Sequence, residues 1–75
     1  MDIQKIIKGL SSTQKSCLKY AKYGKIDSNY FVEIDDDTRE STLKALARKE
    51  MVVYHRYRCW LTGVGELVRK ELNAL

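Results

Sequence analysis

Residues 43–67 read LKALARKEMVVYHRYRCWLTGVGEL and carry the clearest structural signals in the chain. Leu43 and Leu46 lie three residues apart, the spacing at which side chains share one face of a helix. The runs at 51–55 and 58–62 are rich in strand-forming residues and are separated by only two residues, which predicts a β-hairpin. The segment therefore predicts a helix followed directly by a hairpin.

The helix is expected to span residues 38–49. Asp37 and Glu40 have the spacing of a capping box, which would fix its start. The face opposite its leucines displays small polar and basic side chains, which suit contact with a phosphate backbone. An ordinary solvated face explains them equally well. The residues of this face are Thr38, Ser41, Lys44, Ala45, Arg48 and Lys49.

Two short helices are expected earlier in the chain. The first occupies residues 1–10, with Asp2 placed to cap its start. Ser11 and Gln14 then have capping-box spacing, so a second helix is expected to start there and to run to about Tyr23, where a glycine follows and stops it.

The segment 28–34 allows two interpretations. Residues 30–34 read YFVEI, which is rich in strand formers and alternates in polarity, so a short strand is favoured. The alternative is a single helical turn that starts after Asp27.

A C-terminal helix is expected over residues 63–75, and its leucines continue to the last residue. Such a stripe docks either on its own domain or on a second copy. The first helix carries a matching stripe, so we predict a homodimer formed by the first and last helices; the alternative is a monomer that folds both helices onto its own body. Trp60, the only tryptophan, is expected in the core. The dimer residues would be Ile3, Ile6, Ile7, Leu10, Leu67, Leu72 and Leu75.

The helix, the hairpin and the string LTGVGEL that follows resemble the winged-helix repressors of the MarR and PadR type over about residues 11–75. In those families a wing follows the recognition helix, and leucine-threonine, two residues and a glycine open the next helix. The resemblance implies a mostly α fold with a small β-hairpin: a single winged-helix domain, residues 1–75, with extra N- and C-terminal helices. Glu50 stands where those families often have glycine, so we expect a non-glycine residue to make the turn at the helix end.

Charge is separated along the chain, whose net charge is +4. Residues 1–25 hold six lysines and one aspartate, residues 26–38 hold five acids and no base, and residues 39–75 hold eight bases and four acids. Such blocks can give a basic face and an acidic face. A polyanion would bind the basic face.

The sequence argues against several classes of function. A single histidine and the lack of nucleophile, phosphate-loop and zinc-protease motifs argue against an enzyme. Cys17 and Cys59 lack metal-site spacing, so we expect free buried thiols, no metal and no cofactor. The apolar runs are too short to cross a bilayer, so we expect no membrane contact and a cytoplasmic location.

The resemblance and the excess of basic over acidic residues together favour a DNA-binding protein that regulates transcription. The helix at 38–49 would enter the major groove of double-stranded DNA, and the hairpin tip at 55–58 would lie on the backbone. The alternative is a winged-helix protein-interaction module that holds a protein partner and no DNA. The tip residues assigned to DNA are Arg56, Tyr57 and Arg58.

Overall fold

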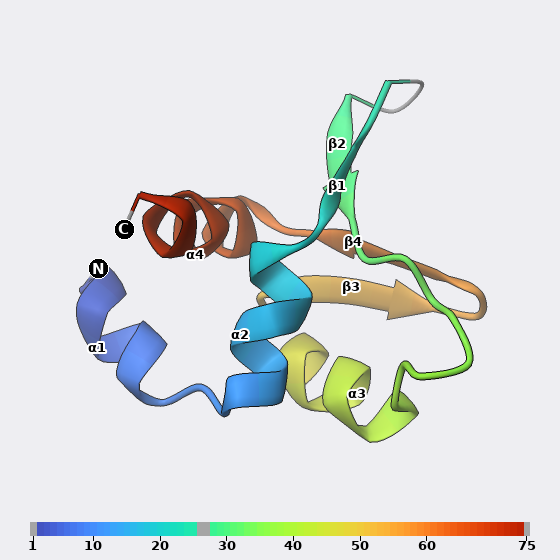
Figure 1. The fold of residues 1–75 in the computed structure, drawn as a ribbon, viewed down its shortest axis with the longest axis horizontal. Helices are drawn as coiled ribbons and strands as arrows, with labels where there is room; N and C mark the ends of the chain where they lie inside the picture. The colour runs from blue at the N-terminus through green and yellow to red at the C-terminus, as the bar shows by residue number, and fades with distance from the viewer. Residues whose placement is uncertain (1, 26–27, 75) are drawn as a thin grey trace.

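The computed structural model describes residues 2–25 and 28–74 (Figure 1). These residues form four helices and four strands. In chain order the elements are α1 (Ile3–Lys8), α2 (Ser12–Lys19), β1 (Lys22–Gly24), β2 (Asn29–Phe31), α3 (Glu40–Arg48), β3 (Val52–His55), β4 (Arg58–Leu61) and α4 (Gly63–Asn73).

The strands form one antiparallel sheet in the order β1-β2-β4-β3. The sheet consists of two hairpins, β1 with β2 and β3 with β4. They join through the pair Phe31 and Trp60, on β2 and β4. Figure 1 shows the first hairpin projecting away from the helices, so only part of the sheet lies over the core.

The expected fold class, mostly α with one small hairpin, is wrong. Of the described residues, 48% are helical and 20% lie in strands, which makes a small α+β domain. The second helix ends at Lys19 instead of reaching Tyr23, because Lys22–Gly24 leaves the helix and becomes a strand. Tyr23 pairs across the strands with Tyr30, their ring centroids 5.2 Å apart in an edge-to-face arrangement. This contact between separate strands outweighs the local helical pattern, so a winged-helix domain with a single hairpin does not describe the fold.

The short strand expected at 30–34 is present as β2, Asn29–Phe31. Val32 extends the pairing by one hydrogen bond, because its N–H donates to the carbonyl of Cys59 at 2.8 Å. Residues 28–34 contain no helical turn. The proposed start of such a turn, at Asp27, lies outside the described residues.

The core lies between the helices and one face of β3 and β4. Burial alternates along these strands: Val52, Cys59 and Leu61 are buried, whereas Val53 is exposed and Trp60 is half-buried. Successive side chains of a strand point to opposite faces, so Trp60 points away from the core, and its expected place in the core is wrong. The buried apolar residues are Leu10, Leu18, Ala21, Val32, Leu43, Leu46, Met51, Val52, Cys59, Leu61, Val68 and Leu72.

The apolar stripes of α1 and α4 pack within the chain. The three isoleucines of α1 pack against the core, α1 contacts α4, and the amide of Gln4 donates to the carboxylate of Glu71 at 2.6 Å. Leu10 and Leu72 are buried. Two helices that cover one another no longer need a second copy, which removes the reason that motivated the homodimer.

Little of either stripe is left as a contact surface. Leu67 is 52% exposed, and Leu75 lies outside the described residues. The homodimer therefore stays a prediction that rests on Leu67 among the described residues. The alternative function is a protein-interaction module that would bind its partner through these stripes. It would have the same small exposed apolar surface for that contact.

The end of α3 is a left-handed turn made by a glutamate. The φ angle of Glu50 is 63°. Its N–H donates to the carbonyl of Ala47 at 3.0 Å, and the N–H of Met51 donates to the carbonyl of Leu46 at 3.0 Å. This pair of hydrogen bonds is a Schellman motif, in which glycine usually takes the left-handed position. The expectation that a non-glycine residue makes this turn is confirmed.

Replacing Glu50 with glycine is expected to stabilise the fold. Glu50→Gly removes the steric cost of a side chain in the left-handed region and should raise the free energy of unfolding by about 1 kcal/mol, which raises Tm by about 4–8 °C. Glu50→Ala is the control, because alanine keeps the Cβ and the strain. Thermal denaturation by circular dichroism measures both. Equal midpoints for the glycine and alanine variants would contradict the expectation.

Thr62 joins the end of α3 to the hairpin and to α4. Its Oγ1 accepts from the N–H of Gly65 at 3.1 Å, which caps α4, and its hydroxyl donates to the carbonyl of Glu50 at 2.5 Å. The N–H of Thr62 donates to the carbonyl of Met51 at 3.0 Å. Gly65 lies so close that a Cβ there would be 2.0 Å from the carbonyl oxygen of Met51. These contacts fix where the hairpin leaves α3 and therefore how the two elements face each other.

Candidate nucleic-acid interface

The start of α3 is Glu40, two residues later than expected, and the capping box with Asp37 is not formed. Arg39 is the N-cap residue and supplies no side-chain hydrogen bond. Instead, the carboxylate of Asp35 accepts from the N–H of Asp37 and from the hydroxyl of Thr38, both at 2.9 Å. Aspartate binds nearby backbone N–H groups readily, so this turn competes with an earlier helix start.

A basic groove of about 570 Å³ runs between α3 and the β3–β4 hairpin. Lys44 and Arg48 lie one helical turn apart on α3, and Arg56 at the hairpin tip lines the same groove. The structure thus brings together three of the residues predicted to bind DNA. The complete lining is Glu40, Lys44, Ala47, Arg48, Tyr54, His55 and Arg56.

This groove carries more positive than negative charge. Lys44 forms an ion pair with Glu40, Nζ to Oε1 3.2 Å, and both side chains are well exposed, so water screens the pair. Within the described part of the chain, Arg48 and Arg56 form no ion pair. Two guanidinium groups are therefore free to contact an anion.

The hairpin tip is a two-residue turn, Arg56 and Tyr57, closed by the pair His55 and Arg58. Arg56 has a φ of 55°, and Tyr57 is 92% exposed. Arg56 lines the groove beside α3, whereas Arg58 lines a second groove. The tip residues predicted to act as one unit therefore belong to two different surfaces.

The other residues predicted to contact DNA differ in their exposure and in their hydrogen bonds. Ser41 is exposed on the outward side of α3, and Ala45 is half-buried. Thr38 lies before the helix, half-buried, with its hydroxyl bonded to Asp35, so its predicted place on the helix is wrong. Lys49 follows the last residue of α3, and its Nζ donates to the carbonyl of Gly9 at 3.1 Å, which ties α3 to the end of α1.

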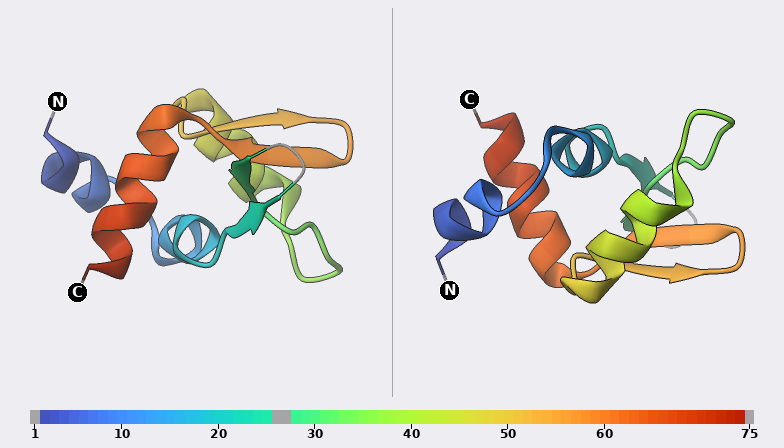
Figure 2. Two further views of the ribbon diagram at one scale, coloured as in Figure 1. Left: turned by 90° about the horizontal axis from the view of Figure 1, so that it is seen from above. Right: turned by 90° about the horizontal axis from the view of Figure 1, so that it is seen from below.

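Three consecutive aspartates, residues 35–37, lie in the loop before α3. Figure 2 shows this loop and the β3–β4 hairpin on opposite sides of the N-terminal end of α3. Carboxylates repel a phosphate backbone, and the repulsion is strongest at short range. A polyanion is therefore favoured on the side of α3 that faces the hairpin.

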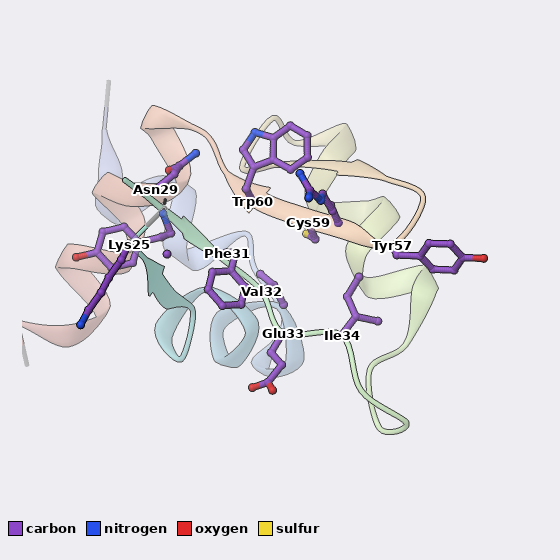
Figure 3. Close-up of a pocket in the computed structure, with 12 residues that line it drawn as sticks. Lys25, Asn29, Phe31, Val32, Glu33, Ile34, Tyr57, Cys59 and Trp60 are labelled. Atoms are coloured by element: carbon purple, nitrogen blue, oxygen red, sulfur yellow. Dashed lines mark hydrogen bonds between the residues drawn. The ribbon is translucent and has the colours of Figure 1, made fainter. Parts of the chain in front are cut away.

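The second groove, of about 660 Å³, lies on the sheet face that the helices leave open (Figure 3). The sequence did not predict this groove, because Trp60 was expected to lie in the core. The alternation of Arg58, Cys59, Trp60 and Leu61 was the available signal, since an inward cysteine and leucine place the residue between them outward. Its lining includes Lys25, Asn29, Phe31, Glu33, Ile34, Tyr57, Arg58 and Trp60.

Both cysteines are free thiols, Cys59 buried and Cys17 half-buried. Burial, with a smaller contribution from the neighbouring Cys17, raises the pKa of the Cys59 thiol to about 11. Burial also raises the pKa of Cys17, with the charge of Asp35 adding to the effect. Among residues 2–25 and 28–74, no three His, Cys, Asp or Glu side chains come together as a metal site.

Cys59 is expected to resist thiol reagents in the folded state. Its raised pKa leaves about one thiol in a thousand ionised at pH 8, so labelling should be far slower than in denaturant. The thiol ionises first in the unfolded chain, with a pKa of 9.0, so stability falls as pH rises from 9.0 to about 11. Labelling of Cys17→Ser, which leaves Cys59 as the only cysteine, measures this. Equal rates in the folded and the denatured protein would contradict the buried position.

No protein family, curated protein or solved structure matches this chain. In the described part of the chain, no helix has the length and apolar character needed to cross a membrane.

Proposed function

We propose that the protein binds double-stranded DNA through the groove between α3 and the β3–β4 hairpin. The observation that carries this proposal is the meeting of Lys44 and Arg48 from α3 with Arg56 from the hairpin along one groove. Cations that lie on two separate elements, a helix and a hairpin, can contact several phosphates along a DNA backbone. Regulation of transcription, by occupying DNA that other proteins need, is the role proposed for this binding.

The dimensions of α3 support this geometry. An α-helix with its side chains is about 10–12 Å in diameter, which matches the width of the major groove, about 12 Å, and the nine residues of α3 extend about 14 Å. Ser41 is a short, exposed side chain on the outward side of the helix and can approach a base edge. Because it stands beside long cations, phosphate contacts dominate the affinity, and sequence preference is weak.

The acidic loop limits the approach to one direction. Asp36 and Asp37 are exposed at the tip of the turn that precedes α3. DNA that lay across the N-terminal end of the helix would meet these carboxylates. The duplex therefore lies along the hairpin side, where Arg56 is placed.

The test removes the two cations of the helix face. Lys44→Ala with Arg48→Ala should weaken binding to a duplex of two helical turns, and the slope of log affinity against log salt should flatten by about two units, roughly one for each lost phosphate contact. Fluorescence anisotropy over a salt series measures both quantities. Both side chains are exposed, so the thermal midpoint should stay unchanged.

Lys8→Ala with Lys70→Ala is the matched control. It removes the same charge from exposed positions on α1 and α4, outside the groove lining. The proposal requires a clearly smaller loss of affinity in this variant. Equal losses in the two double variants would mean that only net charge matters, and no binding by the wild-type protein at low salt would rule out the function.

A further inference from the structure

The sheet face that points away from the helices carries a row of exposed or half-buried side chains across all four strands. The strand register places Lys22 opposite Phe31, Phe31 opposite Trp60, and Trp60 opposite Val53. Phe31 is 37% exposed, Val53 is 41% exposed and Trp60 is half-buried. Two aromatic rings on neighbouring strands therefore lie on this face, the Phe31 ring exposed and the Trp60 ring partly covered.

The two rings are held in place individually. Figure 3 shows the indole of Trp60 and the ring of Phe31 pointing apart instead of stacking on each other. The Phe31 ring lies over Gly24, where a Cβ would be 3.4 Å from Cδ1 of the ring. A ring that rests on a backbone without a side chain keeps its position and leaves its other side open. Each ring can thus receive a flat ligand group.

The charge beside the rings favours an anionic ligand. Arg58 and Lys25 line the same groove. Its one carboxylate among the described residues, that of Glu33, forms an ion pair with Lys22 at 2.5 Å. The groove lining therefore carries two positive charges and one negative charge, and Lys22 stands next to the negative one.

From this combination we infer that the open sheet face binds single-stranded DNA. Unpaired bases stack on the ring of Phe31 and on the open side of the half-buried Trp60 ring, while Arg58 and Lys25 contact the phosphates of the strand. Aromatic stacking with a cationic border is the chemistry by which sheets hold unpaired bases. A duplex keeps its bases stacked inside and has no base face to offer these rings.

Two features separate this ligand from its rivals. A second copy docked on the same face would bring the cations of two identical surfaces together, which opposes association. RNA differs by its 2′-hydroxyl, and the side-chain oxygen of Asn29, in this groove, is not available to it because that oxygen already accepts from the N–H of Tyr30 at 2.9 Å, so oligo-uridine is the competing ligand in the titration. Single-stranded DNA needs only stacking and phosphate contact.

Trp60 is the only tryptophan of the chain, so its fluorescence reports directly on this surface. Titration of the full chain with oligo-deoxythymidine should quench the emission to saturation. Phe31→Leu should weaken the binding by about tenfold, because one stacking surface is lost, whereas Phe31→Tyr should keep it. Arg58→Ala should flatten the salt slope by about 0.7, the value for one phosphate contact with a single strand. Circular dichroism confirms that each variant is folded.

The test distinguishes this site from the duplex site. Lys44→Ala with Arg48→Ala should leave the quenching by oligo-deoxythymidine intact, and Phe31→Leu should leave duplex affinity intact. Absence of quenching at low salt, or equal affinity of folded Phe31→Leu and wild type, would overturn the inference. Tighter binding of oligo-uridine would overturn the assignment to DNA. A doubled mass in sedimentation equilibrium that Phe31→Leu abolishes would assign this face to a second copy.

Discussion

Gly65→Ala is expected to cost about 3 kcal/mol or more of folding free energy and to lower Tm by about 12–24 °C. The added Cβ would lie 2.0 Å from the carbonyl oxygen of Met51, and a backbone atom cannot rotate out of the way. Moving it would also disturb the hydrogen bond from Thr62 to that carbonyl. Domains have only about 5–15 kcal/mol of stability, so this single change removes a substantial part of the total.

Gly63→Ala is the matched control on the same helix. A Cβ at Gly63 meets nothing within 4 Å, and alanine is the better helix former. Its stability should therefore equal or slightly exceed that of the wild type. Thermal melts of the two variants decide the matter, and a Gly65→Ala midpoint within a few degrees of Gly63→Ala would show that α4 and the backbone of Met51, just before β3, are less closely packed than described.

Leu46→Ala should destabilise the protein by about 2–5 kcal/mol. Leu46 has no exposed surface, and its carbonyl accepts the closing hydrogen bond of the turn at the end of α3. Its truncation leaves a cavity at the junction of α3 and the hairpin, where the walls of the basic groove meet. Urea denaturation, with the slope unchanged and the midpoint lowered, measures the loss.

Leu67→Ala compares the same chemical change at an exposed position. Leu67 is 52% exposed on α4, so its truncation should alter stability by only about 0.5 kcal/mol. A loss equal to that of Leu46→Ala would contradict the burial pattern. Sedimentation of Leu67→Ala also tests the predicted homodimer, since Leu67 is its one largely exposed residue among the described dimer residues.

Both proposed surfaces include the β3–β4 hairpin, and each contains one of its two arginines. Arg56 lines the groove beside α3, and Arg58 lines the groove on the open sheet face. A duplex and an unpaired strand would therefore be held on different sides of the same hairpin. Single substitutions of these two arginines should therefore separate the two proposed activities.

Local signals in the sequence determined the starts of α1 and α2 and the second hairpin, but not the start of α3. Asp2 accepts from the N–H of Lys5, and Ser11 forms its capping box with Gln14, as their spacing predicted. Such hydrogen bonds join residues three apart and need no other part of the chain. The two β-rich runs also pair as expected, since a two-residue turn brings them together without help from distant residues.

The tertiary structure decided what depends on contacts between segments distant in the sequence. Lys22 and Tyr23 were expected at the end of a helix, but Lys22–Gly24 became a strand because a partner strand was available, and that fourth strand changed the fold class. The pairing of Phe31 with Trp60 created the open aromatic face, which no local pattern contains. Likewise, the stripes of α1 and α4 were visible in the sequence, but only the folded chain shows that they cover each other. Periodicity shows which side of an element is apolar, whereas the surface that buries it depends on the packing of the whole chain.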